Sequence, residues 1–162
     1  MKSRCRTRLF LLCIIALAAA TAVVYHSDRK KAVESLLRKG QSAIETENID
    51  ELTTLVSPYY RDEMGFSYAS LRGGFSYVFS EFNNLRVDYR IVNITAGKDT
   101  SIADLLVWTR GAWAAGTLDL TGKENDPEPV SILCKREMLK WKVIGSRWPD
   151  RKSGFSGLPG LN

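Results

Sequence analysis

The sequence predicts an α+β fold in which N-terminal helices cover one face of an antiparallel sheet, preceded by a single transmembrane or signal helix. Three patterns carry this prediction. An uncharged apolar run occupies residues 9–25, apolar residues recur every three or four positions as far as residue 82, and they alternate with period two from residue 85 onward. Helices followed by strands joined through short turns are typical of α+β folds with antiparallel sheets.

Charge and hydropathy together divide the 162 residues into three parts. Residues 1–31 hold seven cations and one anion, whereas residues 32–162 hold 16 cations and 17 anions, so a leader of net +6 precedes a part of net −1. We expect a basic and apolar membrane segment at 1–26, one domain at 27–148 and a flexible tail at 149–162. A domain without excess positive charge predicts no nucleic-acid partner.

The leader allows two interpretations. Four cations among the first eight residues precede 17 uncharged residues, which is long enough for a short membrane span at residues 9–25. That predicts a single-pass inner-membrane protein with its domain on the periplasmic side. Alternatively, Ala20-Thr21-Ala22 is a signal-peptidase site, and cleavage near Ala22 would release the domain into the periplasm. The anchor is favoured because residues 23–25 extend the apolar run beyond that site.

Three helices follow the leader. Ser27 or Asp28 can cap the first, Asp50 the second and Ser67 the third. Gly73-Gly74 in the third helix predicts either a break or a close neighbour, because glycine is unfavourable inside helices. The inward-facing stripes of the first and third helices are Val33, Leu36, Leu37, Gly40, Ala43 and Ile44, and Leu71, Phe75, Val78, Phe79 and Phe82.

Four strands are expected after the helices. Alternating residues predict the first at 85–91, and an apolar run predicts the second at 102–109, with a bend or bulge between Gly111 and Gly116 before the alternation resumes at 118–120. The third begins at 130 and ends near 137, and the fourth covers 141–148.

Few residues of the domain suggest metal or cofactor chemistry. Cys134 is the only cysteine after the leader, and a small buried strand residue is the favoured interpretation. His26, at the edge of the apolar run, is the only histidine. We therefore expect no metal site and no cofactor, since a metal cluster needs several ligands at suitable spacing.

Several short segments, taken in their order, resemble the NTF2-like superfamily of cystatin-like α+β cones. They are the turn Ser57-Pro-Tyr-Tyr-Arg-Asp62, the strand start Asp99-Thr-Ser-Ile-Ala103, the strand end Lys135-Arg-Glu137 and the closing strand Leu139-Lys-Trp-Lys-Val-Ile144. The resemblance covers about residues 29–148. Within the superfamily the chain is most similar to bacterial envelope proteins that have an N-terminal apolar segment and no assigned activity.

This resemblance implies a strongly curved sheet wrapped around helices, often enclosing an apolar pocket. Some superfamily members are isomerases or dehydratases, many are binding modules, and dimers are common. We expect a membrane-anchored binding or scaffold module more than an enzyme. The aromatic candidates for lining a pocket that holds a small apolar ligand are Tyr59, Tyr60, Phe75, Phe79, Tyr89 and Trp141.

The alternative is a small cofactor-free isomerase or lyase, similar to ketosteroid isomerase, that acts on an apolar substrate in the cone. Its catalytic residues are unknown, and Asp104 is the one weak candidate because it lies among apolar strand residues that would raise the pKa of a carboxyl group. A position inside a closed pocket near a tyrosine hydroxyl would favour this alternative.

A second sheet face also carries apolar side chains. Ile102, Leu106 and Trp108 alternate with Ala103, Leu105 and Val107, so the two sets lie on opposite faces of their strand, and the sequence leaves open which face meets the helices. Because exposed apolar area tends to be covered, we predict a homodimer contact on this second face.

Overall fold

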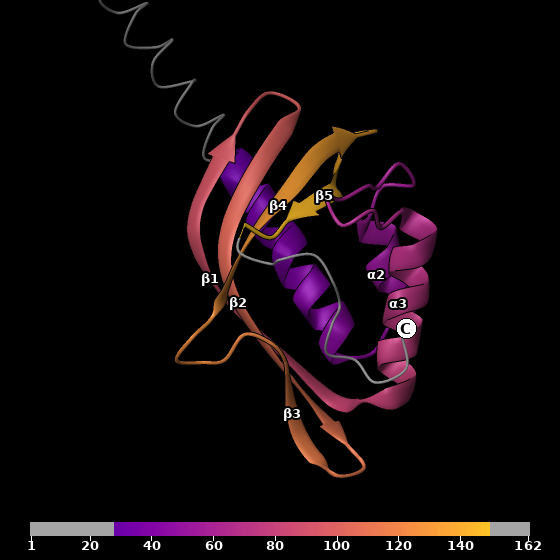
Figure 1. The fold of residues 1–162 in the computed structure, drawn as a ribbon. Helices are drawn as coiled ribbons and strands as arrows, with labels where there is room; N and C mark the ends of the chain where they lie inside the picture. Colours follow the sequence, from indigo (N-terminus) through magenta and orange to yellow (C-terminus); the bar gives the residue numbers. More distant parts are fainter. Residues whose placement is uncertain (1–27, 150–162) are drawn as a thin grey trace, which may run out of the picture.

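In the computed structural model, which describes residues 28–149, three helices pack on a five-stranded antiparallel sheet (Figure 1). The first helix occupies residues 28–45. The remaining elements, in chain order, are α2 (Ile49–Leu55), α3 (Tyr68–Glu81), β1 (Asn83–Ala96), β2 (Thr100–Trp113), β3 (Gly116–Thr121), β4 (Glu128–Glu137) and β5 (Lys140–Arg147). The predicted anchor at 9–25, the cleavage site near Ala22, the Ser27 cap and the tail from residue 150 onward lie outside the described residues.

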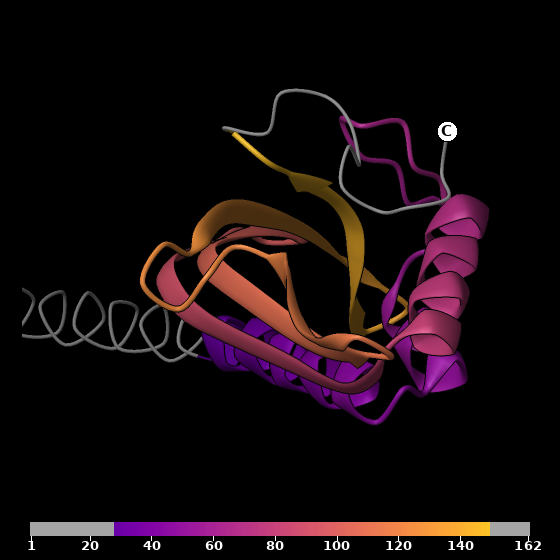
Figure 2. The same ribbon diagram turned by 60° about the horizontal axis from the view of Figure 1, so that its bottom comes forward.

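The sheet is strongly curved and has the strand order β1-β2-β4-β5, with β3 paired to the far half of β2. Figure 2 shows the first helix lying along one face of this sheet while α3 stands at its edge. The predicted α+β class and curved antiparallel sheet are therefore confirmed.

The hydrophobic core lies between the first helix and the sheet. Val33 and Leu36 of that helix are buried against Ala103 and Leu105 of β2 and Cys134 of β4. The helical stripe was thus predicted correctly, and so was the buried position of Cys134. Two hydrogen bonds also join the helix to β1: Gln41 Nε2 donates to the Val87 carbonyl at 2.6 Å, and Val87 N donates to Glu45 Oε1 at 3.2 Å.

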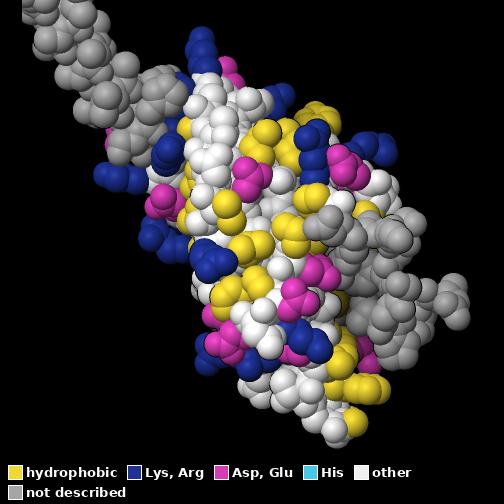
Figure 3. Space-filling view, turned by 60° about the vertical axis from the view of Figure 1, so that its left-hand side comes forward, with side chains coloured by type: hydrophobic (Ala, Val, Ile, Leu, Met, Phe, Trp, Pro, Cys, Tyr) yellow, Lys and Arg dark blue, Asp and Glu magenta, His cyan; other side chains and the backbone are white. Residues whose placement is uncertain are grey.

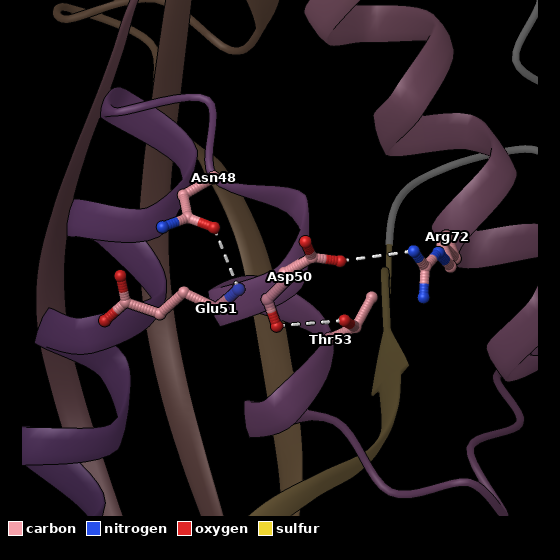
Figure 4. Close-up of polar contacts among 5 residues, drawn as sticks. All are labelled: Asn48, Asp50, Glu51, Thr53 and Arg72. Atoms are coloured by element: carbon pink, nitrogen blue, oxygen red, sulfur yellow. Dashed lines mark hydrogen bonds and ion pairs between the residues drawn. The ribbon is translucent and has the colours of Figure 1, made fainter.

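The cap of α2 differs from the prediction. Asn48 and not Asp50 is the N-cap, because its side-chain oxygen accepts a hydrogen bond from Glu51 N at 3.0 Å (Figure 4). Asp50 lies in the first turn, where its carboxylate forms an ion pair with Arg72 of α3 at 3.2 Å. The ion pair is exposed, so it orients the two helices and adds little stability.

The third helix begins as predicted, with Ser67 and Ser70 in a reciprocal capping box. The Gly73-Gly74 prediction was wrong on both counts. The helix continues through both glycines, and a Cβ built at either position has no neighbour within 4 Å among residues 28–149.

The sequence pattern did not predict two irregularities of the strands. The expected bend near Gly116 is a true turn that separates β2 from β3, which makes five strands where four were expected. A register shift between Ile91 and Asn93 leaves Val92 exposed and returns Ile94 to the core side. A β-bulge of this kind adds one residue without disturbing the pattern on either side.

Candidate functional site

A buried polar cluster lies where the loop after α2 meets the end of β5. The Tyr60 hydroxyl is 3.0 Å from Asp62 Oδ2 and 3.1 Å from Ser146 Oγ, and Trp148 Nε1 donates to the same serine oxygen at 3.3 Å. Tyr60 and Ser146 are buried. Burial raises the pKa of Tyr60 above its ordinary value, so its hydroxyl stays protonated.

Asp62 is committed to building its own loop. Its Oδ1 accepts hydrogen bonds from Met64 N at 3.0 Å and Phe66 N at 2.8 Å, while Oδ2 is the partner of Tyr60. An aspartate that accepts backbone bonds two and four residues ahead is typical of a tight turn. With three donors on its two oxygens, this carboxylate serves as the nucleus of a turn.

The same loop is attached to the sheet through its backbone. Ser57 N donates to the Val143 carbonyl at 2.8 Å and Arg61 N to the Ile144 carbonyl at 3.1 Å, so the loop runs along the edge of β5. Ser57 Oγ also donates to Glu137 Oε1 at 2.9 Å. These bonds hold the polar cluster in place.

The apolar stripe of α3 is incompletely covered. No residue of α3 is buried, whereas the stripe of the first helix is. Leu71, Phe75, Val78 and Phe79 of α3 are all half-buried, and the rings of Phe75 and Phe79 lie with their centroids 5.8 Å apart. Of the predicted pocket residues, Phe75 and Phe79 therefore form a partly covered aromatic pair on α3.

The other aromatic candidates separate into two groups. Tyr89 of β1 and Trp141 of β5 are half-buried and pack against the core cluster. Tyr59 is 84% exposed, because only its neighbour Tyr60 turns toward the sheet. The structure therefore brings Tyr89 and Trp141 to the core side of the sheet and leaves Tyr59 on the surface.

Asp104 lies on the sheet face opposite the helices. Its neighbours Ala103 and Leu105 point into the core, and successive strand residues point to opposite faces. Asp104 pairs across the strands with Ser131, whose hydroxyl donates to Asp104 Oδ1 at 2.6 Å. This geometry does not support a role for Asp104 inside the cone.

The predicted dimer-face residues share that outer face with Asp104. Ile102 is 37% exposed, and Leu106 and Trp108 are half-buried. Figure 3, which brings the β1 side forward, shows hydrophobic side chains separated by acidic and basic ones. The face is mixed in character and does not form one continuous apolar patch.

Sequence reasoning missed two residues on the core side. Ser146 was not singled out, because an isolated serine at a strand end carries no pattern. Glu128 was not singled out either, and it pairs with Val107 of β2 and thus shares the core side of the sheet. A shallow open depression beside it is lined by Asp119, Lys123, Asp126 and Glu128 among others, and none of the predicted pocket residues reaches it.

Within residues 28–149, no three histidine, cysteine or acidic side chains are placed to hold a metal ion. In the same part of the chain, no helix has the length and apolarity needed to cross a membrane.

Comparison with known proteins shows the fold. No family model and no curated protein sequence matches the chain. Among solved structures, it is similar to a Mycobacterium tuberculosis protein of unknown function, with a TM-score of 0.64, 11% identity and coverage of 78% of this chain and 73% of the other. It is equally similar to a candidate scytalone dehydratase from Novosphingobium aromaticivorans, at a TM-score of 0.64, 11% identity and coverage of 79% and 85%.

A third similar structure is a candidate dehydratase of the NTF2-like family from Streptomyces avermitilis, with a TM-score of 0.58, 10% identity and coverage of 75% of this chain and 95% of the other. The chain therefore has the NTF2-like, cystatin-like α+β fold, as its sequence resemblance implied. Identities this low define the fold and leave the activity open.

Proposed function

We propose that this protein is a membrane-anchored, NTF2-like binding module that presents the apolar stripe of α3 to a small apolar ligand. The observation that carries the proposal is that α3 has an aromatic stripe yet buries none of its residues. A helix in a fully packed core would bury that stripe, as the first helix does. Apolar surface left partly open, with a few polar groups nearby, is typical of ligand sites.

The buried polar cluster at the end of β5 favours binding over catalysis. Tyr60 and Asp62 are a tyrosine–carboxylate pair, but the carboxylate is occupied by three donors and the hydroxyl by two partners. Asp104 points away from the helices. An isomerase or lyase of the ketosteroid-isomerase type would need a free carboxylate base facing the substrate, which neither aspartate offers.

The anchoring half of the proposal rests on the leader. Four cations followed by 17 uncharged residues are typical of a segment that stays in the inner membrane, and the first described helix follows three residues later. The domain would then be held on the periplasmic side.

The ligand proposal is tested with a fluorescent apolar probe such as N-phenylnaphthylamine. The probe is added to the purified full chain in detergent, at concentrations below those at which it fluoresces in the detergent micelles alone. Phe79→Ala is expected to weaken probe binding at least threefold, because it removes one ring of the Phe75–Phe79 pair. Tyr59→Ala is the matched control, since Tyr59 is an exposed aromatic outside the stripe. Equal probe binding by both variants and the parent would refute the ligand site.

The anchor is tested by alkaline carbonate extraction of membranes and mass spectrometry of the N-terminal peptide. An intact N-terminus in the carbonate-resistant fraction is expected. A mature chain beginning after Ala22 in the soluble fraction would establish the cleaved alternative.

A further inference from the structure

The turn between β4 and β5 exposes two large apolar side chains. Met138 is 97% exposed and Leu139 is 83% exposed, and they are the only two residues between the paired positions Glu137 and Lys140. Both have positive backbone φ angles, 45° for Met138 and 68° for Leu139.

These residue types are unfavourable for such a turn. Two-residue hairpin turns with positive φ at both central positions strongly prefer Asn-Gly, because side chains that branch or extend beyond Cβ crowd the left-handed conformation. Met138 and Leu139 thus strain the backbone and bury little surface in return. Strain of this kind points to a function outside the fold itself.

Cations surround the apolar pair. Residues 135–142 contain Lys135, Arg136, Lys140 and Lys142 against the single anion Glu137, which is a net charge of +3 in a part of the chain whose overall charge is −1. Lys135 and Lys142 occupy directly opposite positions on β4 and β5. Like charges in opposite positions repel each other, and a nearby anionic surface relieves that repulsion.

This turn lies at the end of the domain where the chain enters it. Arg136 N donates to the Asp99 carbonyl at 2.8 Å, so the β4–β5 turn lies beside the β1–β2 turn. Arg29, in the first helical turn, donates to the Gly97 carbonyl of that same β1–β2 turn at 2.6 Å. Figure 1 shows the first described residues of the first helix and the β1–β2 turn toward the top, opposite the β2–β3 hairpin.

Only two residues, His26 and Ser27, separate the apolar segment, which ends at Tyr25, from the described helix at residue 28, a distance of three chain steps. Three such steps span at most about 11 Å. If residues 9–25 cross the membrane, this end of the domain is held next to the lipid headgroups.

We propose that this end of the domain lies on an anionic phospholipid bilayer, with Met138 and Leu139 inserted at the boundary between headgroups and acyl chains and the surrounding cations on lipid phosphates. Exposed apolar side chains flanked by cations have the chemistry of an interfacial membrane contact. The inference deepens the proposed anchoring and orients the α3 stripe relative to the membrane.

The test uses the full chain reconstituted into phosphatidylcholine vesicles with or without 30% phosphatidylglycerol. A nitrobenzoxadiazole label is attached at position 138 in Met138→Cys, with Cys5→Ser and Cys13→Ser and with the buried Cys134 left in place. We expect nitroxide groups near the headgroup end of the lipid acyl chains to quench this label at least twofold, and more strongly with anionic lipid. A matched label in Thr117→Cys, on the β2–β3 hairpin about 40 Å away along β2, should be unaffected.

A double variant separates membrane insertion from folding. Met138→Asn with Leu139→Gly supplies the preferred turn residues, so we expect the melting midpoint to rise by about 2–4 °C. Quenching of a label in Lys98→Cys, on the neighbouring β1–β2 turn, should nevertheless fall at least twofold. Because the variant is more stable, unfolding cannot produce that loss.

The charge requirement has its own matched control. Lys135→Gln with Lys140→Gln should remove the dependence of quenching on anionic lipid. Arg86→Gln with Arg110→Gln makes the same charge change near the opposite end of β2, where these two arginines pair, and should leave that dependence intact.

The outcomes distinguish this proposal from the anchor itself. An unquenched label at position 138 on a chain that resists carbonate extraction overturns the surface contact and leaves the anchor standing. Quenching of a chain that carbonate releases supports the surface contact and refutes the anchor. Equal quenching in neutral and anionic vesicles overturns the contact with anionic lipid.

Discussion

Gly145 of β5 lies directly against the backbone of Arg61, so closely that a Cβ at position 145 would be 2.6 Å from the Arg61 carbonyl oxygen. The neighbouring bond from Arg61 N to the Ile144 carbonyl fixes this approach. The loop that carries Tyr60 and Asp62 can therefore dock on β5 only because residue 145 has no side chain. This contact positions the polar cluster beside the sheet.

Gly145→Ala is expected to lower the free energy of unfolding by about 1–3 kcal/mol, because the loop must move away from the strand to admit the methyl group. Urea denaturation followed by circular dichroism measures the change. Gly40→Ala is the control: no atom lies within 4 Å of its Cβ, and the residue is in the first helix, so this variant should be at least as stable as the parent. Equal stability of Gly145→Ala and the parent would contradict the close approach.

The two glycines of α3 should yield the opposite result. Gly73→Ala and Gly74→Ala are each expected to raise the free energy of unfolding by about 0.5–1 kcal/mol, because both positions are exposed, helical and open around Cβ. Thermal melting of the single and double variants measures the gain. A loss of stability would show that α3 is broken at these residues.

The buried hydroxyl of Tyr60 contributes to stability through its two partners. Tyr60→Phe is expected to cost about 1–2 kcal/mol, because Ser146 and Asp62 each lose a hydrogen bond in a buried site. Tyr59→Phe serves as the control and should change stability little, since that side chain is exposed. If both variants unfold at the same denaturant concentration, the cluster has no stabilising role.

Stability should fall at alkaline pH. Burial raises the pKa of Cys134 to about 12 and raises the pKa of Tyr60 as well. The unfolded chain therefore releases these protons first, beginning near pH 9 for the thiol, and binds fewer protons than the folded chain above that pH. Below about pH 8 these two groups add no pH dependence, and at higher pH each lowers the free energy of unfolding by up to about 1.4 kcal/mol per pH unit.

Cys134→Ala separates the two contributions. It removes the thiol, so the decline that begins near pH 9 should be lost while the tyrosine contribution, which begins near pH 10, remains. Urea titrations at pH 8, 9.5 and 11 give the comparison, and an unchanged pH slope in this variant would contradict a protonated thiol in the folded core.

A homodimer through the outer face of the sheet remains a proposal. We expect sedimentation of the detergent-solubilised full chain at micromolar concentration to give a dimer mass, and Leu106→Glu to give a monomer, because a charge would then be buried in the contact. Tyr59→Glu is the control, because Tyr59 is exposed in the loop after α2, away from this face. A monomer mass for the parent chain would refute the contact.

The elements that sequence patterns predicted well are those with one buried face. The first helix and strands β1 and β2 each bury a regular stripe, and their apolar spacing followed directly from that burial. The Ser67 cap was also predictable, because its hydrogen bonds lie within one turn of the chain. Local periodicity and local hydrogen bonds require no knowledge of distant neighbours.

The candidate site was less predictable because it depends on contacts between remote segments. Tyr59 and Tyr60 are adjacent in sequence, yet Tyr59 is exposed and Tyr60 is buried. The buried hydroxyl of Tyr60 has its hydrogen-bond partner in Ser146, 86 residues away. Asp104 lies among apolar residues, but its role depends on which face of β2 meets the helices.

The sequence by itself determined the α+β class, the core-facing stripes and the division between a basic apolar leader and a domain of net −1. Only the tertiary structure decided that Asp104 faces away from the helices and that Met138, Leu139 and four cations gather beside the start of the first helix. The physical reason is that side-chain periodicity records whether a face is buried, whereas the identity of the residues that cover it is set by strand register and by the docking of loops that are distant in sequence.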